Sequence, residues 1–202
     1  MQRTISAMVG KGSVNHNSRK FRAENVDGTR THLNIDYCNE NIKTVYHELF
    51  DEALERYNAK QTRSDRKIKD YYEKIRSSKQ EKPFHEIILQ VGGKGNMNAD
   101  TENGELAKQI LDEYYQGFQE RNPQLRVFSA HLHMDEATPH LHIDFVPYVT
   151  GWKGKGMDTR VSLKQALKSL GFQGGNKHDT ELNQWINHEK ELLAEIARQH
   201  EI

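Results

Sequence analysis

The chain has 202 residues, of which 35% are hydrophobic and 29% are charged, and we expect a single domain with a sizeable core over residues 1–202. Lysine plus arginine and aspartate plus glutamate both total 29, so net charge indicates no class of partner. The one cysteine, Cys38, excludes an internal disulfide and a cysteine-based zinc knuckle. No apolar run reaches membrane-spanning length and no signal peptide is recognisable, so we expect a cytoplasmic protein.

Two candidate strands occupy the amino-terminal region. Thr4–Val9 is typical of a strand that Gly10 ends, and Thr31–Tyr37 alternates as a second strand does. A turn at Gly28 predicts that the second strand folds back and pairs with the first. The polar loop between them is basic, because Arg3–Asn34 contains six Lys or Arg residues against two acids.

Helical periodicity replaces strand alternation from Ile42. Apolar residues recur at helical spacing up to Tyr57, and we expect Asn39 or Asn41 to cap this helix. A second amphipathic helix is expected to begin near Ser64, with a basic outer face. Residues 56–82 contain ten Lys or Arg residues against four acids, which makes them a second basic segment.

The rest of the chain supplies three more strands and three more helices. We expect a buried strand at 84–91, a helix at 106–118, paired strands at 126–133 and 141–149, a helix from Ser162 to Leu170, and a last helix from Asp179 or Thr180. Five strands with helices in runs predict an α+β fold, a five-stranded antiparallel sheet flanked by helices. The last helix shows no stop signal before Ile202, so we expect the natural protein to continue.

Four of the eleven histidines lie in one short stretch of the chain. Because side chains on a strand alternate between its faces, His131 and His133 share one face of a first strand, and His140 and His142 share one face of a second. The connector between the strands is short and contains proline, which predicts an antiparallel hairpin. The two histidine pairs would then lie side by side, with Glu136 nearby.

Neutral imidazole binds divalent transition metals, and three histidines with an open coordination position describe a catalytic rather than a structural metal site. We expect His133, His140 and His142 to be the ligands, because His133 lies across the hairpin from the His-x-His pair. Two roles are open for Glu136: it is either a fourth metal ligand or a general base. Asp144 shares the face of the His-x-His pair, so we expect it to accept an N–H from a ligand ring.

The residues around this hairpin resemble a known family. His133–His142 matches the His-x-Asp-Glu-x-x-Pro-His-x-His motif of the MobV (Pre/Mob) plasmid relaxases, members of the HUH endonucleases, while His16–Arg19 and His32–Asn34 match their other two motifs in order. The resemblance implies an antiparallel sheet flanked by helices, a divalent metal, manganese or else magnesium, and nicking of one DNA strand at a plasmid transfer origin. His131 lies outside the motif and is expected to support the site or the fold.

The resemblance also indicates a nucleophile. Most HUH enzymes attack with a tyrosine, but here no tyrosine precedes Tyr37 and only Tyr148 follows the histidine pair. The remaining tyrosines lie on or beside apolar helical stripes, which favours core packing. Similarity to the MobV family points to His16 instead, whose neutral ring, with an ordinary pKa of about 6.5, can attack phosphorus without an alkoxide having to form.

The resemblance gives the neighbouring motif residues roles in catalysis and in binding DNA. Attack by His16 would leave the 5′ phosphate on the protein as a phosphoramidate and release a 3′ hydroxyl, which can later rejoin the strand. Glu136 would hold or deprotonate the His16 ring, and Arg19 would contact the scissile phosphate. The other residues expected at the DNA near the site are Asn17, Lys20, Arg22, His32 and Asn34.

A third basic segment completes the charge map. Residues 153–177 contain six basic residues against Asp158, and we expect Lys153, Lys155 and Arg160 to bind DNA phosphates together with the other two segments. The glycine-lysine loop in this segment favours single-stranded DNA, with an adjacent hairpin stem. Dimerisation through residues beyond 202 stays open.

Two other classes of protein stay open. His131–Asp135 resembles the His-x-His-x-Asp start of metallo-β-lactamase-like hydrolases, but Glu136 stands where their next histidine is expected. The other alternative is a metal-stabilised nucleic-acid-binding module without catalysis. A denaturation-stable adduct with single-stranded DNA separates the relaxase from both.

Overall fold

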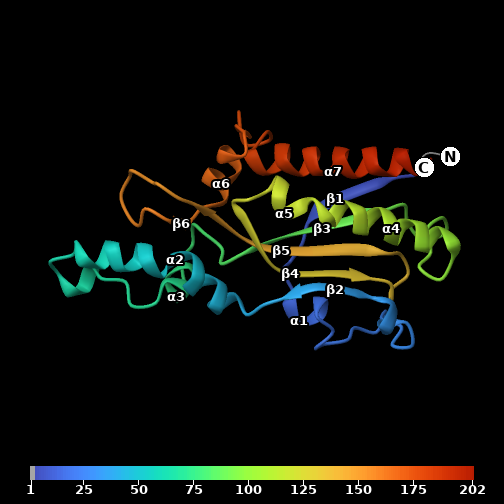
Figure 1. The fold of residues 1–202 in the computed structure, drawn as a ribbon, viewed down its shortest axis with the longest axis horizontal. Helices are drawn as coiled ribbons and strands as arrows, with labels where there is room; N and C mark the ends of the chain where they lie inside the picture. The colour runs from blue at the N-terminus through green and yellow to red at the C-terminus, as the bar shows by residue number, and fades with distance from the viewer. Residues whose placement is uncertain (1–2) are drawn as a thin grey trace.

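One antiparallel sheet organises the computed structural model, which describes residues 3–202 (Figure 1). In chain order the elements are β1 Ile5–Val9, α1 Val14–Asn17, η1 Thr31–Leu33, β2 Ile35–Asn39, α2 Ile42–Ala59, η2 Ser64–Arg66, α3 Tyr71–Arg76, β3 His85–Val91, α4 Glu102–Gln116, α5 Phe118–Arg121, β4 Leu125–His133, β5 His140–Val149, β6 Arg160–Val161, α6 Leu163–Ser169 and α7 Glu181–Gln199. Here η denotes a short 3-10 helix.

The strand order β1-β3-β5-β4-β2 confirms the predicted α+β fold with a five-stranded antiparallel sheet, to which β6 adds a short sixth strand beside the end of β5. The predicted hairpin of β4 and β5 lies near the middle of the sheet, between β3 and β2. Its strands are long and buried on both faces, which suits a central position.

The predicted pairing of the first two strands is wrong. β1 pairs with β3 and β2 pairs with β4, so these two strands form opposite edges of the five-stranded order. The segment between them contains α1 and η1 and crosses from one edge to the other, and the turn at Gly28 makes no hairpin. Long-range pairing with the apolar central strands outweighs the local turn signal, because it buries far more apolar surface.

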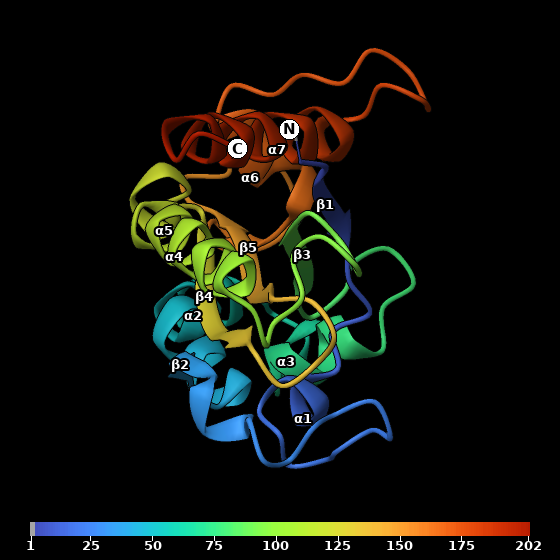
Figure 2. The ribbon, with the colours of Figure 1, turned by 90° about the vertical axis from the view of Figure 1, so that its right-hand side faces the viewer.

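The apolar face of the sheet is covered by helices α4 and α7 (Figure 2). Strand alternation turns Leu132, Leu141 and Ile143 toward this side, where each is fully buried. Both helices begin at a threonine cap: Thr101 accepts from the Gly104 amide at 3.2 Å, and Thr180 accepts from the Asn183 amide at 3.1 Å.

The opposite face is divided by a β-bulge between Val127 and Ser129. The bulge turns Phe128 away from the α4 side and into a second apolar cluster with Val146 and the helices α2 and α3. Beyond the bulge the face is polar and carries the histidines. One end of this face is therefore apolar and packed, and the other end is polar.

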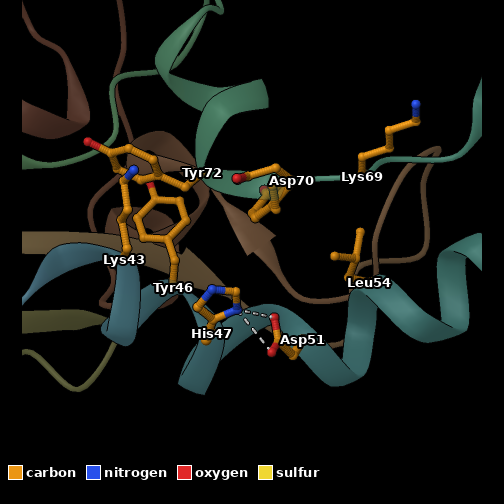
Figure 3. Close-up of a pocket in the computed structure, with 9 residues that line it drawn as sticks. Lys43, Tyr46, His47, Asp51, Leu54, Lys69, Asp70 and Tyr72 are labelled. Atoms are coloured by element: carbon orange, nitrogen blue, oxygen red, sulfur yellow. Dashed lines mark hydrogen bonds and ion pairs between the residues drawn. The ribbon is translucent and has the colours of Figure 1, made fainter.

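Helices α2 and α3 form an arm beside this second cluster. Asn41, one of the two expected caps, accepts from the Lys43 amide and starts α2. The second predicted helix is shorter than expected: Asp70 caps α3 just before Tyr71, and the segment near Ser64 forms only η2. A pocket between the two helices is lined by their side chains and contains none of the candidate site residues (Figure 3).

None of the helices within residues 3–202 combines the length and the apolar character that crossing a membrane requires.

A candidate metal and nucleophile site

The β4–β5 hairpin brings the four clustered histidines together as predicted. Its register places His133 opposite His140 and His131 opposite His142. One ring nitrogen from each of His133, His140 and His142 lies within 4.8 Å of the other two. These three imidazoles are the set expected as metal ligands.

The remaining nitrogen of each of these rings is held by an oxygen acceptor. His133 Nε2 lies 2.8 Å from the Asn17 carbonyl, and His140 Nδ1 lies 2.9 Å from the Thr138 carbonyl. His142 Nδ1 lies 3.0 Å from Glu86 Oε2. Because these oxygens only accept, each held nitrogen carries the ring proton and leaves a lone pair on the nitrogen that faces the cluster.

The cluster fits a divalent transition metal. Within residues 3–202, His142 Nε2 is buried without a hydrogen-bond partner. Burying an unpaired nitrogen costs free energy, unless a metal ion accepts its lone pair. Burial, followed by the charges of the neighbouring rings, lowers the pKa of His133 to about 2, and burial also lowers the pKa of His140. Neutral imidazoles are the form that a metal requires.

Glu86, from β3, is a site residue that the sequence analysis did not identify. Besides holding His142, it accepts from the Gly12 amide at 3.1 Å and from the Asn17 side chain. Burial alone would raise its pKa, but the His142 ring and the other donors lower it to about 2. The sequence did contain one sign of a role for Glu86, because an acidic residue within the apolar run of a buried strand is unusual. Only the register of β3 with β5 shows that the Glu86 side chain lies beside His142.

Asp144 does not hold a ligand ring, which corrects its expected role. Its Oδ2 accepts from Asn17 Nδ2 at 3.1 Å, while Glu86 takes the position beside His142. Burial, followed by the negative charge of Glu86, raises the pKa of Asp144 to about 8. The two carboxyl groups therefore titrate as a pair in which Glu86 loses its proton more readily than Asp144.

His16 faces the cluster from α1, although it lies more than a hundred residues away in the chain. Its Nε2 is 3.5 Å from Glu136 Oε1, an oxygen that is also 3.7 Å from His140 Nε2. The His16 ring centroid is 6.1 Å from that of His133 and 6.5 Å from that of His142. The structure therefore brings together the two parts that the motifs placed far apart.

Arg19 is tied to this junction rather than extended into solvent. Its Nε donates to Asp135 at 3.0 Å, its Nη2 donates to Glu136 at 2.9 Å, and its Nη1 lies 3.3 Å from His16 Nε2. Asp135 is fully buried; burial alone would raise its pKa, but hydrogen bonds from Arg19, Asn34 and Thr31 lower it to about 2. This carboxylate fastens the basic loop to the connector of the hairpin.

Two residues expected at the DNA make their contacts within the protein. Asn17 is 1% exposed, and its amide nitrogen donates to Glu86 and Asp144. Asn34 uses both ends of its amide on the connector: it donates to Asp135 at 2.8 Å and accepts from the Met134 amide at 2.6 Å. Both residues hold the loop and the hairpin together, so neither side chain is free to read DNA.

The other expected DNA contacts fall into two groups. Lys20, Arg22 and His32 are exposed on the loop that carries His16. Lys153, Lys155 and Arg160 lie beyond the end of β5, beside α2 and α3, where Lys155 and Arg160 share a groove with side chains of α3. Two of the three basic segments thus adjoin, while the first segment lies at the histidines.

His131 and the tyrosines lie where the sequence analysis expected them. His131 is outside the triad, with Nδ1 2.6 Å from Asp36 and Nε2 3.1 Å from Ser129. Tyr46 and Tyr114 are buried in the two apolar clusters.

The fold is an antiparallel sheet flanked by helices, and it gathers residues of the three ordered motifs at one site. Residues 12–194 match the profile of Mob_Pre, the plasmid recombination enzyme family, and the chain belongs to this family. This membership confirms the resemblance that the three motifs indicated.

The chain is similar to plasmid recombination enzyme type 2 of Staphylococcus aureus, with 28% identity over 187 residues that cover 86% of this chain and 40% of the relative. Type 3 from Mammaliicoccus lentus is 26% identical over 158 residues, covering 76% of this chain and 32% of the relative. The chain therefore spans about a third to two fifths of the length of these relatives.

Solved structures give a related result. The manganese-bound MobM relaxase domain in complex with a 22-nucleotide oriT DNA of plasmid pMV158 is similar at 21% identity and a TM-score of 0.48. The similarity covers 80% of this chain and 75% of that one.

Proposed function

We propose that this chain nicks and rejoins one strand of DNA at a plasmid transfer origin, with His16 as the nucleophile. The observation that supports this proposal most directly is the meeting of His16 with the three-imidazole cluster around a single carboxylate oxygen, Glu136 Oε1. An imidazole nucleophile beside a site suited to a cation is what phosphoryl transfer requires. Family membership supports DNA as the substrate.

His133, His140 and His142 would hold the cation. Three nitrogen donors favour a transition metal over magnesium, so manganese is proposed, with magnesium as the alternative. When bound, the ion supplies positive charge that stabilises the phosphoryl oxygens in the transition state. Glu136 is close enough to the cluster to complete the donor set or to remain on His16.

His16 would attack through Nε2. An arginine N–H only donates, so the contact with Arg19 Nη1 at 3.3 Å leaves the lone pair on His16 Nε2 and the proton on Nδ1. When this nitrogen attacks the phosphorus, a P–N bond forms, the P–O3′ bond breaks, and the departing 3′ oxygen takes up a proton as the His16 ring releases one. The products are a phosphoramidate on His16 and a free 3′ hydroxyl, and the reverse reaction rejoins the strand.

Arg19 and Glu136 would prepare this attack. All three guanidinium nitrogens of Arg19 are bonded within the protein, so a contact with the scissile phosphate requires Nη1 to exchange His16 for a phosphate oxygen. That exchange would free the His16 lone pair at the moment the phosphate arrives. Glu136, itself held by Arg19 and by Asn25, would take the proton from Nε2 of a protonated His16 ring before the attack.

The test is to trap a covalent protein–DNA adduct and to determine from its stability in acid whether the bond is P–N. The protein is incubated with Mn²⁺ and with labelled single-stranded oligonucleotides that tile the DNA flanking its gene, and a denaturation-stable adduct is sought. A P–N bond is labile in acid and stable in alkali, so the adduct should disappear on mild acid treatment. His16→Ala should abolish the adduct, whereas His47→Ala, a change on the exposed surface of α2, should leave it intact.

Other outcomes identify the alternatives. An acid-stable adduct that survives His16→Ala and is lost in a Tyr→Phe variant would overturn the nucleophile. Cleavage to a free 5′ phosphate with no adduct would indicate a metal-dependent hydrolase. Tight binding to one of these oligonucleotides (called tiles below), without cleavage of any of them, would indicate a nucleic-acid-binding module.

A further inference from the structure

Phe21 is the most exposed large hydrophobic side chain in the described part of the chain, at 61%. Single exposed apolar residues are ordinary, so exposure alone assigns no role. The position of Phe21 is unusual in another respect, because its backbone N–H donates to the Asn15 carbonyl at 3.0 Å, on the short helix that carries His16. The backbone that carries the ring is therefore hydrogen-bonded to the helix of the proposed nucleophile.

The backbone around Phe21 is fixed by a turn rather than left free. Arg19 adopts a positive φ of 58°, a conformation uncommon outside glycine, and its side chain is anchored on Asp135 and Glu136. This turn reverses the chain after α1 and directs the next residues outward. An aromatic ring on such a support loses little entropy when it binds a ligand.

The returning half of the loop is tied to the same connector. The Asp27 amide donates to the Asp135 carbonyl at 2.7 Å, Asn25 donates to Glu136 Oε2 at 2.8 Å, and Arg30 donates to the Glu136 carbonyl at 2.9 Å. The segment that presents Phe21 is thus held at both ends against the residues that surround the metal and nucleophile site.

The chemistry beside the ring is cationic. Lys20 and Arg22 flank Phe21 and are both exposed. An aromatic face between two positive charges is the combination that binds single-stranded nucleic acid, in which the cations contact phosphates and the ring stacks on a base. Neither an apolar protein partner nor a purely ionic ligand makes use of both features.

We propose that Phe21 is a stacking platform for one nucleobase of the DNA strand, at a nucleotide next to the scissile phosphate, with Lys20 and Arg22 on the flanking phosphates. The proposal rests on the proposed function, since it takes single-stranded DNA as the substrate. It adds a contact that positions the strand against His16 through a base. Stacking of this nucleotide would fix the position of the DNA backbone relative to His16.

Equilibrium binding tests the platform without any need for cleavage. Fluorescence anisotropy is measured in EDTA with labelled oligo(dT) and with the tightest-binding tile from the trapping assay. Phe21→Ala should weaken binding about tenfold, the usual effect of losing one base–aromatic stack. Phe21→Trp should restore binding, whereas Phe21→Leu, an apolar side chain without a ring face, should not.

Salt dependence separates the ring from its charged neighbours. Lys20→Ala and Arg22→Ala should each reduce the slope of log affinity against log salt by about one phosphate contact, whereas Phe21→Ala should lower affinity at every salt concentration and leave the slope unchanged. Val9→Ala is the control, because Val9 is another exposed large hydrophobic residue that lies on β1, outside this loop, and it is expected to change neither quantity.

The decisive measurement is a coupling between protein and DNA. An abasic nucleotide is placed at successive positions of the tile, and at one position it should weaken wild-type binding about tenfold and leave Phe21→Ala unaffected. Additive losses at every position, or full binding by Phe21→Leu, would overturn the platform. A tile that shows this coupling yet forms no adduct would retain the platform and reject the nicking reaction.

Discussion

Two buried polar clusters lie on opposite sides of the sheet, and they differ in what they leave unpaired. On the helical side, Glu189 is 1% exposed and accepts from Tyr114, Arg121 and Asn122. Its two oxygens are fully used, and the buried atom left without a partner there, Arg121 Nε, is a donor.

The histidine side leaves two buried atoms unpaired among the described residues, His142 Nε2 and Asp144 Oδ1, and the imidazole nitrogen is an acceptor. His142 Nε2 carries a lone pair that accepts no hydrogen bond within residues 3–202. On each of the three rings, the nitrogen that faces away from the cluster already has an oxygen partner. A donor without a partner cannot bind a cation, whereas an acceptor can. At similar burial, one side thus leaves a donor unpaired and the other leaves an acceptor that suits a cation.

The largest expected effect follows from removing the unpaired acceptor. His142→Ala deletes one of three donor nitrogens, so Mn²⁺ affinity should fall by more than about 100-fold, beyond the usual cost of losing a supporting hydrogen bond. Isothermal titration with MnCl₂ measures it. An unchanged affinity would place the metal elsewhere, and Glu189→Gln, on the other side of the sheet, should bind Mn²⁺ as the wild type does.

A change in the cluster on the helical side should affect stability and leave metal binding unchanged. Glu189→Gln removes the charge that Arg121 and Tyr114 share, so the free energy of unfolding should fall by about 2 kcal/mol. Urea denaturation with and without Mn²⁺ measures this loss. The stabilising increment from Mn²⁺ should be the same as in the wild type. A smaller increment would show that the two clusters are coupled.

A smaller effect is expected where the histidine cluster is supported. Glu86→Ala leaves the His142 ring without its acceptor, and Mn²⁺ affinity should fall about tenfold, whereas Glu86→Gln retains an acceptor oxygen and should lose less. Asp36→Asn is the matched control, since Asp36 holds His131, which is not a proposed ligand. Equal losses in Glu86→Ala and Asp36→Asn would mean a general structural effect.

A pH dependence of stability is expected on the apolar side. Burial, with the Lys82 charge second, lowers the pKa of His85 to about 4, so between about pH 6.5 and 4 the unfolded chain binds a proton there that the folded chain does not. The free energy of unfolding therefore decreases as pH falls through this window. His85→Asn should reduce the decrease, as measured by urea denaturation at pH 7, 6 and 5; parallel curves would contradict the assignment.

Local patterns predicted the parts of the structure that local contacts make. The period-two alternation around His133 and His142 predicted the hairpin and the shared face of the rings. The cap at Ser162 was expected from the sequence, and Thr180 was one of the two residues expected to start the last helix. Each depends on residues close together in the chain. The same reasoning failed for β1 and β2, where a glycine turn suggested a pairing that the central strands prevent.

The long-range parts of the site needed more than pattern. The meeting of His16 with the hairpin was inferred only through the resemblance in motifs, since nothing in its own segment specifies a partner. Glu86 was missed because its contact with His142 depends on the register of β3 and β5, which two apolar strands leave open until both find their places. Asn17 was assigned to DNA because a polar side chain in a basic loop gives no sign of its burial.

The chain positions of the site residues also bear on how the protein folds. His133 and His140 are 7 residues apart, whereas the contact of Asn17 with His133 spans 116 residues, and closing the longer loop costs about 2.5 kcal/mol more chain entropy. Hairpins form within microseconds, and contacts across long loops form later. The imidazole cluster should therefore assemble early and α1 should dock later, so that a partly folded chain would form the proposed metal site before it acquires the proposed nucleophile.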